Sequence, residues 1–260
     1  YKPKEHWYVD QSEHPADTFK VLTHQIRLEA ADFFASIGGR LKACQSGYAA
    51  QWRQKNKCAI DRHNDFLVRV PWSDWKAFSL IWPALPAGVS LQLSNSTPVR
   101  YAQLFECPQV LRVDCNRGTS GIDGSTSTSV GAALLNPGIT VLVTGDMGFL
   151  YDSNALWNRY ITSRLKIIVM KNGGGGIFRF IQGPSELDEL EECFETARQV
   201  DVRGFAELHH FAYFQAEDEL ELQEVLPLFW RESQRPAILA VDTPGLENAE
   251  ILKGYFRNLK

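Results

Sequence analysis

Two apolar runs rich in β-branched residues lie in the middle of the chain, and each is followed by a polar turn that contains glycine. Ile139–Val143 leads into a Gly-Asp turn, and Leu165–Met170 leads into Asn-Gly-Gly-Gly-Gly. Between them, Tyr151–Ser163 carries apolar residues at helical spacing, so we expect a helix there. A strand, a helix and a strand of this length predict a βαβ unit with two parallel strands and a right-handed crossover.

Apolar patterning elsewhere completes an α/β domain. Short runs predict further strands at residues 7–10, 89–93, 110–113 and 237–241. Helical spacing predicts helices at residues 29–34, 41–58, 73–85, 125–134, 205–211, 217–230 and 245–259. The fold class that we expect is therefore α/β, with an open, mostly parallel sheet flanked by helices.

Composition narrows the class of protein. Apolar residues make up 44% of the chain and charged residues 22%, which fits a packed core. The formal net charge is −4 and no basic block is present, which argues against a nucleic-acid partner. No apolar run reaches transmembrane length, and the first residues do not resemble a signal peptide. Five cysteines without a CxxC pair predict the ordinary thiols of a cytoplasmic protein.

The two polar turns of the βαβ unit are the first candidate site. Both belong at the carboxyl edge of the sheet, where open α/β folds bind ligands. Asp146 offers a carboxylate oxygen, Asn172 an amide oxygen, and the glycines offer bare backbone groups. This set suits a Mg²⁺ ion that keeps water and phosphate oxygens as its other ligands. Each turn alone is also typical of a purely structural feature, a helix cap or a flexible Asn-Gly loop.

Two further stretches offer groups that bind anions. The polar turn at residues 94–98 contains Pro98 and predicts a helix start, which can contact an anion or serve only as a cap. Residues 116–124 form a glycine-bearing loop, and Arg117 within it can hold a carboxylate through two hydrogen bonds.

Three motifs carry a resemblance to a known family. Asn116–Gly124 reads NRGTSGIDG, residues 150–156 read LYDSNAL, and residues 172–178 read NGGGGIF. The Gly-Asp turn followed at this distance by Asn-Gly is similar to the diphosphate–metal motif of thiamine diphosphate enzymes. The residues of the three motifs resemble those of one family of thiamine diphosphate enzymes, the MenD family, which are the synthases of menaquinone biosynthesis. The resemblance spans roughly the whole chain and is tightest from Ser94 to Phe178.

The resemblance implies the thiamine diphosphate-binding fold, with thiamine diphosphate and Mg²⁺ (or Mn²⁺) as cofactors. It implies a carboligase, a transferase that decarboxylates 2-oxoglutarate and adds the succinyl unit to isochorismate. As a full-length protein this enzyme is expected to be a homodimer or homotetramer without a membrane span.

The resemblance also implies roles for individual residues. Those expected to bind the metal are Asp146, Asn172 and the carbonyl of Gly174. Those expected to bind the thiamine cofactor are Ser96, Ile122, Gly145, Asp146, Met147, Asn172, Gly174 and Gly175. Those expected to bind substrate are Ser96, Arg100, Arg117, Ile177 and Phe178. The sequence departs from the family pattern at Lys171, Gly173 and Gly176, where other polar residues are common.

In domain terms, the resemblance implies that residues 1–26 are the tail of a central domain and residues 27–260 the diphosphate-binding domain. The amino-terminal pyrimidine-binding domain, with the glutamate that activates the cofactor, is absent from this chain. A complete enzyme would carry about 300 further residues upstream. We therefore expect no catalytic residue within this fragment, and weak cofactor binding with little or no turnover by the fragment alone.

Three alternatives stay open. The acidic stretch Gly183–Arg203 is either a mobile lid over the ligand or a plain exposed segment. The enzyme could be another thiamine diphosphate enzyme that decarboxylates 2-oxo acids, such as a relative of acetolactate synthase. The chain could also be a non-catalytic phosphate-binding α/β module, although it contains neither GxGxxG nor GxxxxGK[ST].

Overall fold

The chain divides into two compact units, Tyr1–Asn56 and Lys57–Lys260. The computed structural model describes residues 2–42, 44–107, 109–195 and 199–259. We expected a domain boundary after residue 26, whereas the compact units divide after Asn56. The assignment of either unit to a named enzyme domain stays a prediction.

The first unit contains a two-stranded parallel sheet and a short helix. Strand β1 (Trp7–Val9) pairs with β2 (His24–Ile26), and α1 (Ala30–Gly38) follows. Phe33 of α1 is buried, and its ring meets that of Trp7 edge to face. The sequence predicted β1 but not β2, and it ended the helix four residues early. Helix α2 (Tyr48–Arg69) crosses the unit boundary; the helix predicted at residues 41–58 started and stopped too early.

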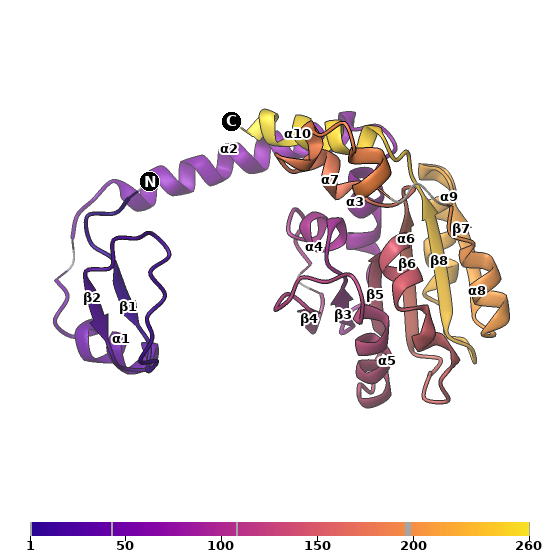
Figure 1. Ribbon diagram of the computed structural model, residues 1–260, viewed down its shortest axis with the longest axis horizontal. Coiled ribbons are helices and arrows are strands. Elements are labelled where there is room, and N and C mark those ends of the chain that lie inside the picture. Colours follow the sequence, from indigo (N-terminus) through magenta and orange to yellow (C-terminus); the bar gives the residue numbers. More distant parts are fainter. Residues whose placement is uncertain (1, 43, 108, 196–198, 260) are drawn as a thin grey trace. The chain divides into compact units, whose positions relative to one another are not determined.

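The second unit is built on a six-stranded sheet in the order β4-β3-β5-β6-β8-β7, and every pairing in it is parallel (Figure 1). This confirms the expected fold class. The strands are β3 (Ser90–Leu93), β4 (Arg112–Cys115), β5 (Thr140–Gly145), β6 (Leu165–Lys171), β7 (Ala212–Ala216) and β8 (Ala237–Asp242). The chain runs from β3 to β4 in one direction and then returns to the other side of β3, so the strand order reverses between β3 and β5.

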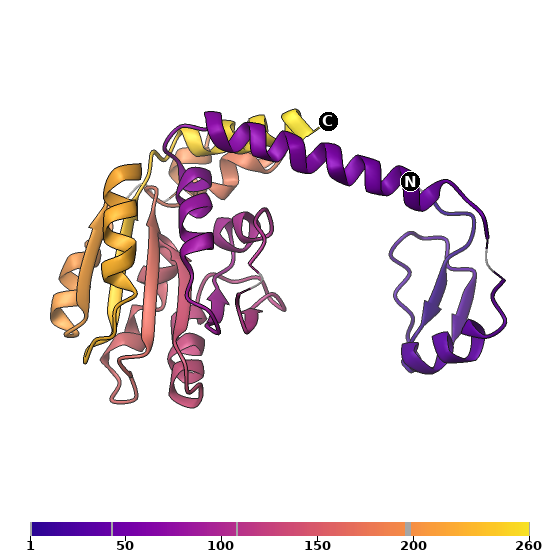
Figure 2. The same cartoon turned by 180° about the vertical axis from the view of Figure 1, so that it is seen from behind.

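Successive strand residues enter two separate cores, as the two faces of a sheet require. Val141 and Val143 of β5 pack on one face, and Leu142 packs on the other. The first core contains residues from α3 (Asp74–Ala84), α4 (Thr97–Ala102), α9 (Glu219–Phe229) and α10 (Glu247–Leu259), and α3 and α9 lie in front of the sheet in Figure 2. The second contains residues from α5 (Ser125–Leu135), α6 (Asp146–Tyr151), the 3-10 helix η1 (Ser153–Trp157) and α8 (Val202–Leu208) (Figure 1). Both faces are therefore covered, which suits a parallel sheet.

The connection from β5 to β6 corrects one prediction. The helix expected at Tyr151–Ser163 is wrong over residues 158–163; instead α6 begins at Asp146, directly after β5, and η1 ends at Trp157. Asn158 explains the stop. Its side chain donates to the carbonyl of Ala155 at 2.7 Å and accepts from the N–H of Tyr160 at 2.8 Å. Such local bonds compete with helix continuation.

Edge elements account for the other errors. Strand β7 was not predicted, because Ala-Tyr-Phe-Gln-Ala is short and only partly apolar, and the helix before it lies three residues earlier than expected. Edge strand β4 lies two residues later than expected. After β6 come α7 (Ile177–Phe180), the 3-10 helix η2 (Pro184–Glu186) and the π-helix η3 (Leu190–Phe194).

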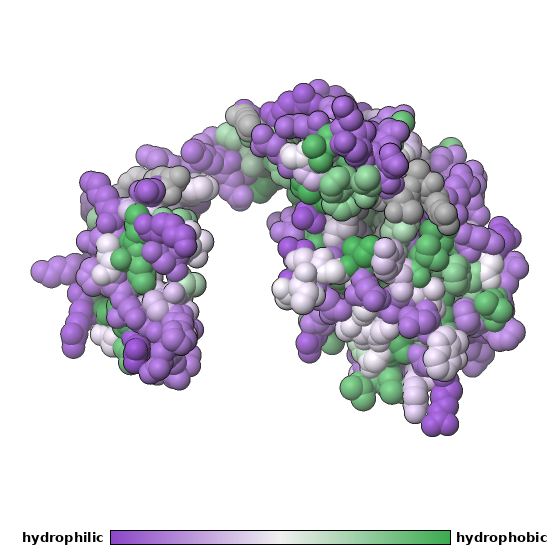
Figure 3. Space-filling view, viewed as in Figure 1, coloured by the Kyte–Doolittle hydropathy of each residue, from purple (hydrophilic) through white to green (hydrophobic). Residues whose placement is uncertain are grey.

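The face of the molecule seen in Figure 3 is largely polar. Polar residues cover most of the visible surface, with apolar residues among them in small groups (Figure 3). Within the described ranges, no helix combines the length and apolar character needed to cross a membrane.

Candidate functional site

The ends of four neighbouring strands enclose one cavity of about 530 Å³ in the second unit. Its wall is formed by the segments that follow β3, β4, β5 and β6, together with η3. The cavity therefore lies at the carboxyl edge of the sheet, where the strand order reverses between β3 and β5. Open parallel sheets bind ligands at such a point because neighbouring loops diverge there.

Eleven of the twelve residues predicted for the site line this cavity. They are Ser96, Arg100, Arg117, Ile122, Gly145, Asp146, Met147, Asn172, Gly175, Ile177 and Phe178. The twelfth, Gly174, is buried but is not among the lining residues, so its carbonyl as a metal ligand stays a prediction. The four polar segments that the sequence singled out are thus brought together by the fold.

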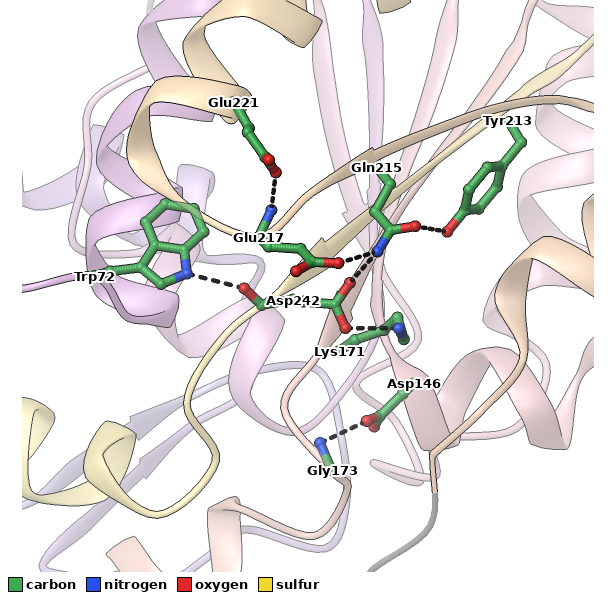
Figure 4. Close-up of polar contacts among 9 residues, drawn as sticks. All are labelled: Trp72, Asp146, Lys171, Gly173, Tyr213, Gln215, Glu217, Glu221 and Asp242. Carbon is green, nitrogen blue, oxygen red and sulfur yellow. Dashed lines mark hydrogen bonds and ion pairs between the residues drawn. The ribbon is translucent and has the colours of Figure 1, made fainter.

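Asp146 places a nearly buried carboxylate in the cavity wall at the first position of α6; only 3% of the residue is exposed. One of its oxygens accepts from the backbone N–H of Met147 at 2.7 Å. The other accepts from the backbone N–H of Gly173 at 3.0 Å (Figure 4). Burial raises the pKa of Asp146 to about 6. Within the part of the chain that the structure describes, no cationic side chain forms an ion pair with it. A buried carboxylate without a cation fits a site for a metal ion.

The loop after β6 requires glycine. Gly173, Gly174 and Gly175 all have positive φ, at 87°, 82° and 66°. A Cβ on Gly175 would lie 2.6 Å from the Cα of Glu195. The loop can therefore approach a ligand, and the 190–195 segment can approach the loop. Asn172, at the start of this loop, accepts from the N–H of Gly174 through Oδ1 at 3.3 Å.

No group of three or more His, Cys, Asp or Glu side chains suited to a metal occurs in the described ranges. The expected ligand set contains only one such side chain, Asp146, beside an amide and a carbonyl oxygen. Its donors are all oxygens, which suits Mg²⁺ or Mn²⁺ when phosphate and water complete the coordination.

Lys171 is one of the departures from the family pattern, and a carboxylate balances its positive charge. Its Nζ lies 2.6 Å from Oδ1 of Asp242 at the end of β8, and Gln215 donates to the other oxygen of Asp242 at 3.4 Å (Figure 4). The backbone carbonyl of Asp242 accepts from the indole N–H of Trp72 at 2.9 Å. These bonds tie the end of β6 to β8, which helps to fix the strand end from which the Asn172 loop departs.

Two arginines that form no ion pair with a described carboxylate also line the cavity. Arg100 donates to the carbonyl of Ser96 at 2.6 Å, and Arg117 donates to Oδ1 of Asn95 at 3.0 Å. Neither forms an ion pair with any described carboxylate. Burial, and then the charge of Arg117, lower the pKa of Arg100. Two neighbouring cations held without a counter-charge indicate a site for an anionic ligand.

Ser96, the residue directly before α4, has a strained backbone conformation. Its φ is 75° and its ψ is −134°, a region that residues other than glycine avoid. Ser120, which also lines the cavity, has φ 58°. Strain of this kind often gathers at ligand-binding sites, where the surrounding structure maintains it.

Asn95 is a site residue whose role the sequence did not reveal. It is 1% exposed, and its amide donates to the carbonyls of Asn116 at 2.7 Å and Gly121 at 2.6 Å. Because it also accepts from Arg117, it fixes the loop after β4 in the cavity wall. The sequence signal was only a polar turn, since the partners lie more than twenty residues away.

The acidic segment reaches the cavity as well. Cys193 and Phe194 line it, and the rings of Phe194 and Phe178 meet edge to face. Arg179 forms ion pairs with Glu191 at 2.8 Å and Glu195 at 2.6 Å. Residues 190–195 therefore pack against the site. Residues 196–198 of the expected lid lie outside the described residues, and opening of this segment stays a prediction.

Comparisons with known proteins show which enzymes the chain is similar to. No family model matches the chain. A 2-succinyl-5-enolpyruvyl-6-hydroxy-3-cyclohexene-1-carboxylate synthase from Porphyromonas gingivalis is 46% identical, over 98% of this chain and 46% of its own length. The enzymes of that name from Flavobacterium psychrophilum and Bacteroides fragilis are 42% and 37% identical, over all of this chain and 47% and 46% of their own lengths. Over nearly all of its own length, the chain is therefore similar to part of each of these synthases.

The chain spans about half the length of these synthases. Similarity to these synthases agrees with the resemblance carried by the 116–124, 150–156 and 172–178 motifs. All three motifs contribute to the cavity lining: the Asn116–Gly124 loop and the glycine loop after β6 through several residues each, and the 150–156 motif through Tyr151.

Proposed function

We propose that this chain forms the part of a 2-succinyl-5-enolpyruvyl-6-hydroxy-3-cyclohexene-1-carboxylate synthase that binds the cofactor diphosphate and its metal. The full-length enzyme then decarboxylates 2-oxoglutarate and joins the succinyl unit to isochorismate, as a cytoplasmic homodimer or homotetramer. One observation carries the proposal. The buried carboxylate of Asp146, the Asn172 loop, Arg100 and Arg117 line the same cavity.

The metal end of the cavity is assigned to Asp146, Asn172 and the carbonyl of Gly174. The Mg²⁺ or Mn²⁺ ion would neutralise Asp146 and hold the diphosphate of the cofactor. Gly145, Met147 and Gly175 also line the cavity, and they are assigned to the cofactor. Thiamine diphosphate, when bound, supplies the chemistry of decarboxylation and carbon–carbon bond formation.

The substrate end is assigned to the arginines and to an apolar wall. Arg100 and Arg117 would hold carboxylate groups, which both substrates carry, and Ser96 would sit between substrate and cofactor. Ile122, Ile177 and Phe178 would support the cofactor rings and keep water away from the reacting atoms. No residue of this chain is assigned as the acid or base that activates the cofactor. That role falls to a glutamate of an amino-terminal domain, so the chain alone is expected to be inactive.

Calorimetry tests the proposal. Binding of thiamine diphosphate, ATP and NAD would be measured with and without Mg²⁺. Of the three ligands, we expect only thiamine diphosphate to bind, and its binding to require Mg²⁺. This binding should be lost in Asp146→Ala. It should be retained in the control Asp61→Ala, which removes an exposed carboxylate of α2. Preference for ATP or NAD would favour a general phosphate-binding module. Unchanged binding by Asp146→Ala would remove the assigned metal site.

A further inference from the structure

Asp74 is a buried carboxylate that contacts a predicted metal ligand. It is the first residue of α3, only 1% of it is exposed, and it lies 98 residues before Asn172 in the sequence. Its Oδ2 accepts from the side-chain N–H of Asn172 at 2.8 Å, and its Oδ1 accepts from the hydroxyl of Thr243 at 2.6 Å. The backbone N–H of Asp74 is bound to Oδ1 of Asn248 at 2.8 Å. Asp74 is thus fixed from three segments.

This contact determines which way the Asn172 amide faces. A carboxylate oxygen offers only acceptor capacity to the amide, so the Nδ2 end of Asn172 must point to Asp74. The Oδ1 end then lies on the other side of the same planar group and accepts from the N–H of Gly174, and Asn172 itself lines the cavity. Without Asp74 the amide could rotate by half a turn and present N–H groups, which repel a cation.

The segment that follows β8 also contacts the backbone around Asn172. The N–H of Thr243 donates to the carbonyl of Lys171 at 2.9 Å. A Cβ on Gly245 would overlap the carbonyl oxygen of Asn172, so the segment after β8 packs directly on the Asn172 loop. Because the peptide is fixed, the orientation of the side-chain amide is the remaining freedom, and Asp74 removes it.

We propose that Asp74 is a positioning residue, which holds the amide of Asn172 so that Oδ1 faces a divalent cation. This inference rests on the proposed function, because it assumes that the cavity binds a metal with thiamine diphosphate. It assigns a role to a side chain that touches neither the cofactor nor the substrate. Partners that orient a metal ligand typically change metal affinity by about 10- to 100-fold when they are removed.

The test is a titration of Mn²⁺ in the presence of thiamine diphosphate, with free Mn²⁺ followed by electron paramagnetic resonance, on the full-length protein. Asp74→Leu removes the acceptor, and we expect Mn²⁺ affinity to fall by about 10- to 100-fold. Asp74→Asn keeps an acceptor oxygen for Asn172 while Thr243 accepts from its amide, so affinity should stay within about threefold of wild type. Thr243→Val disturbs the same cluster but leaves the Asp74–Asn172 bond, and it should also stay near wild type.

The outcomes separate the possible roles. An equal loss in Asp74→Asn and Asp74→Leu would mean that the charge of Asp74 matters, not the orientation it imposes, and would overturn the inference. An equal loss in Thr243→Val and Asp74→Leu would reduce Asp74 to a packing role. If Asp74→Leu bound Mn²⁺ with the same affinity as the wild type, the inference would be overturned directly. Absence of Mn²⁺ binding in the wild type, or full binding in Asp146→Ala, would instead defeat the proposed function.

A second measurement covers the case in which Asp74→Leu does not fold. The side-chain NH₂ signals of Asn172, assigned by their loss in Asn172→Asp, are followed by NMR in the wild-type protein. A hydrogen bond to a buried carboxylate should slow hydrogen exchange of one of these protons relative to exposed asparagines. Exchange as fast as that of an exposed asparagine would overturn the inference without any substitution at Asp74.

Discussion

Oδ2 of Asp146 accepts a hydrogen bond from the backbone N–H of Gly173 at 3.0 Å, which joins the end of β5 to the loop after β6 (Figure 4). The two turns that the sequence placed at one sheet edge are therefore in direct contact. The contact also explains why Asp146 can remain buried, since backbone donors partly replace the water it has lost. A cation is the one favourable partner that the described residues do not provide for it.

The buried Asp146 should make the stability of the metal-free chain depend on pH. Burial raises its pKa from the usual 3.8 to about 6 in the folded chain. Between these two values the folded state binds more protons than the unfolded state, so the free energy of unfolding falls as pH rises. The stabilisation that proton binding by Asp146 gives to the folded state is fully present below about pH 4 and is lost as pH rises through 6. From pH 5 to pH 7.5 the free energy of unfolding should therefore fall by about 1 kcal/mol.

Urea unfolding in EDTA at pH 5 and at pH 7.5 measures this contribution. Asp146→Asn cannot titrate, so the stability difference between the two pH values should be smaller in it than in the wild type by about 1 kcal/mol. Asp61→Asn, at an exposed site, should keep the wild-type difference. Equal differences in wild type and Asp146→Asn would show that Asp146 titrates near its usual value.

Local sequence patterns sufficed for the strand ends that build the site. The runs before Asp146 and Asn172 are continuous and β-branched, which identifies buried parallel strands, and the polar turns after them must share one edge. The resemblance then supplied Arg100 and Ile122. What local patterns could not supply are contacts between distant segments.

Asp74 and Asn95 illustrate the limit. Asp74 looks like an ordinary acidic residue in the first turn of a helix, because its partner Asn172 is 98 residues away. Asn95 belongs to a polar turn whose hydrogen bonds reach residues 116–121. The helix expected at residues 151–163 failed for a different reason, since side-chain bonds of Asn158 stop it despite apolar spacing.

The glycines of the loop after β6 should differ in their tolerance of alanine. Gly175 combines a φ of 66° with contact to Glu195, so Gly175→Ala should lower the free energy of unfolding by about 2 to 4 kcal/mol. Gly173 has a φ of 87° but open space around its Cα, so Gly173→Ala should cost only about 1 kcal/mol. Urea unfolding of the two variants compares them. A similar cost in both would mean that the 190–195 segment moves away without penalty.

Replacing Ser96 by glycine should relieve backbone strain. Ser96 holds φ 75° and ψ −134°, which glycine adopts freely. We expect Ser96→Gly to raise the free energy of unfolding by about 1 kcal/mol, measured by urea unfolding. Ser163 lies in a turn without positive φ, and Ser163→Gly should lower stability by about 0.5 kcal/mol. If both glycine variants are destabilised alike, Ser96 is not strained.

Arg117 should control affinity for dicarboxylates. Its guanidinium is held by Asn95 beside Arg100 and lacks a carboxylate partner among the described residues, so an incoming carboxylate relieves the repulsion between the two cations. Loss of such charged hydrogen bonds should weaken 2-oxoglutarate binding in Arg117→Ala by about 10- to 100-fold, measured by calorimetry on the cofactor-loaded full-length protein.

Arg159, which stacks on exposed Tyr160, provides the control, and Arg159→Ala should bind as wild type does. Arg117→Lys should recover only part of the loss, because an ammonium cannot form the paired bonds of a guanidinium. Equal affinity in Arg117→Ala and wild type would place the carboxylate of the substrate elsewhere in the cavity.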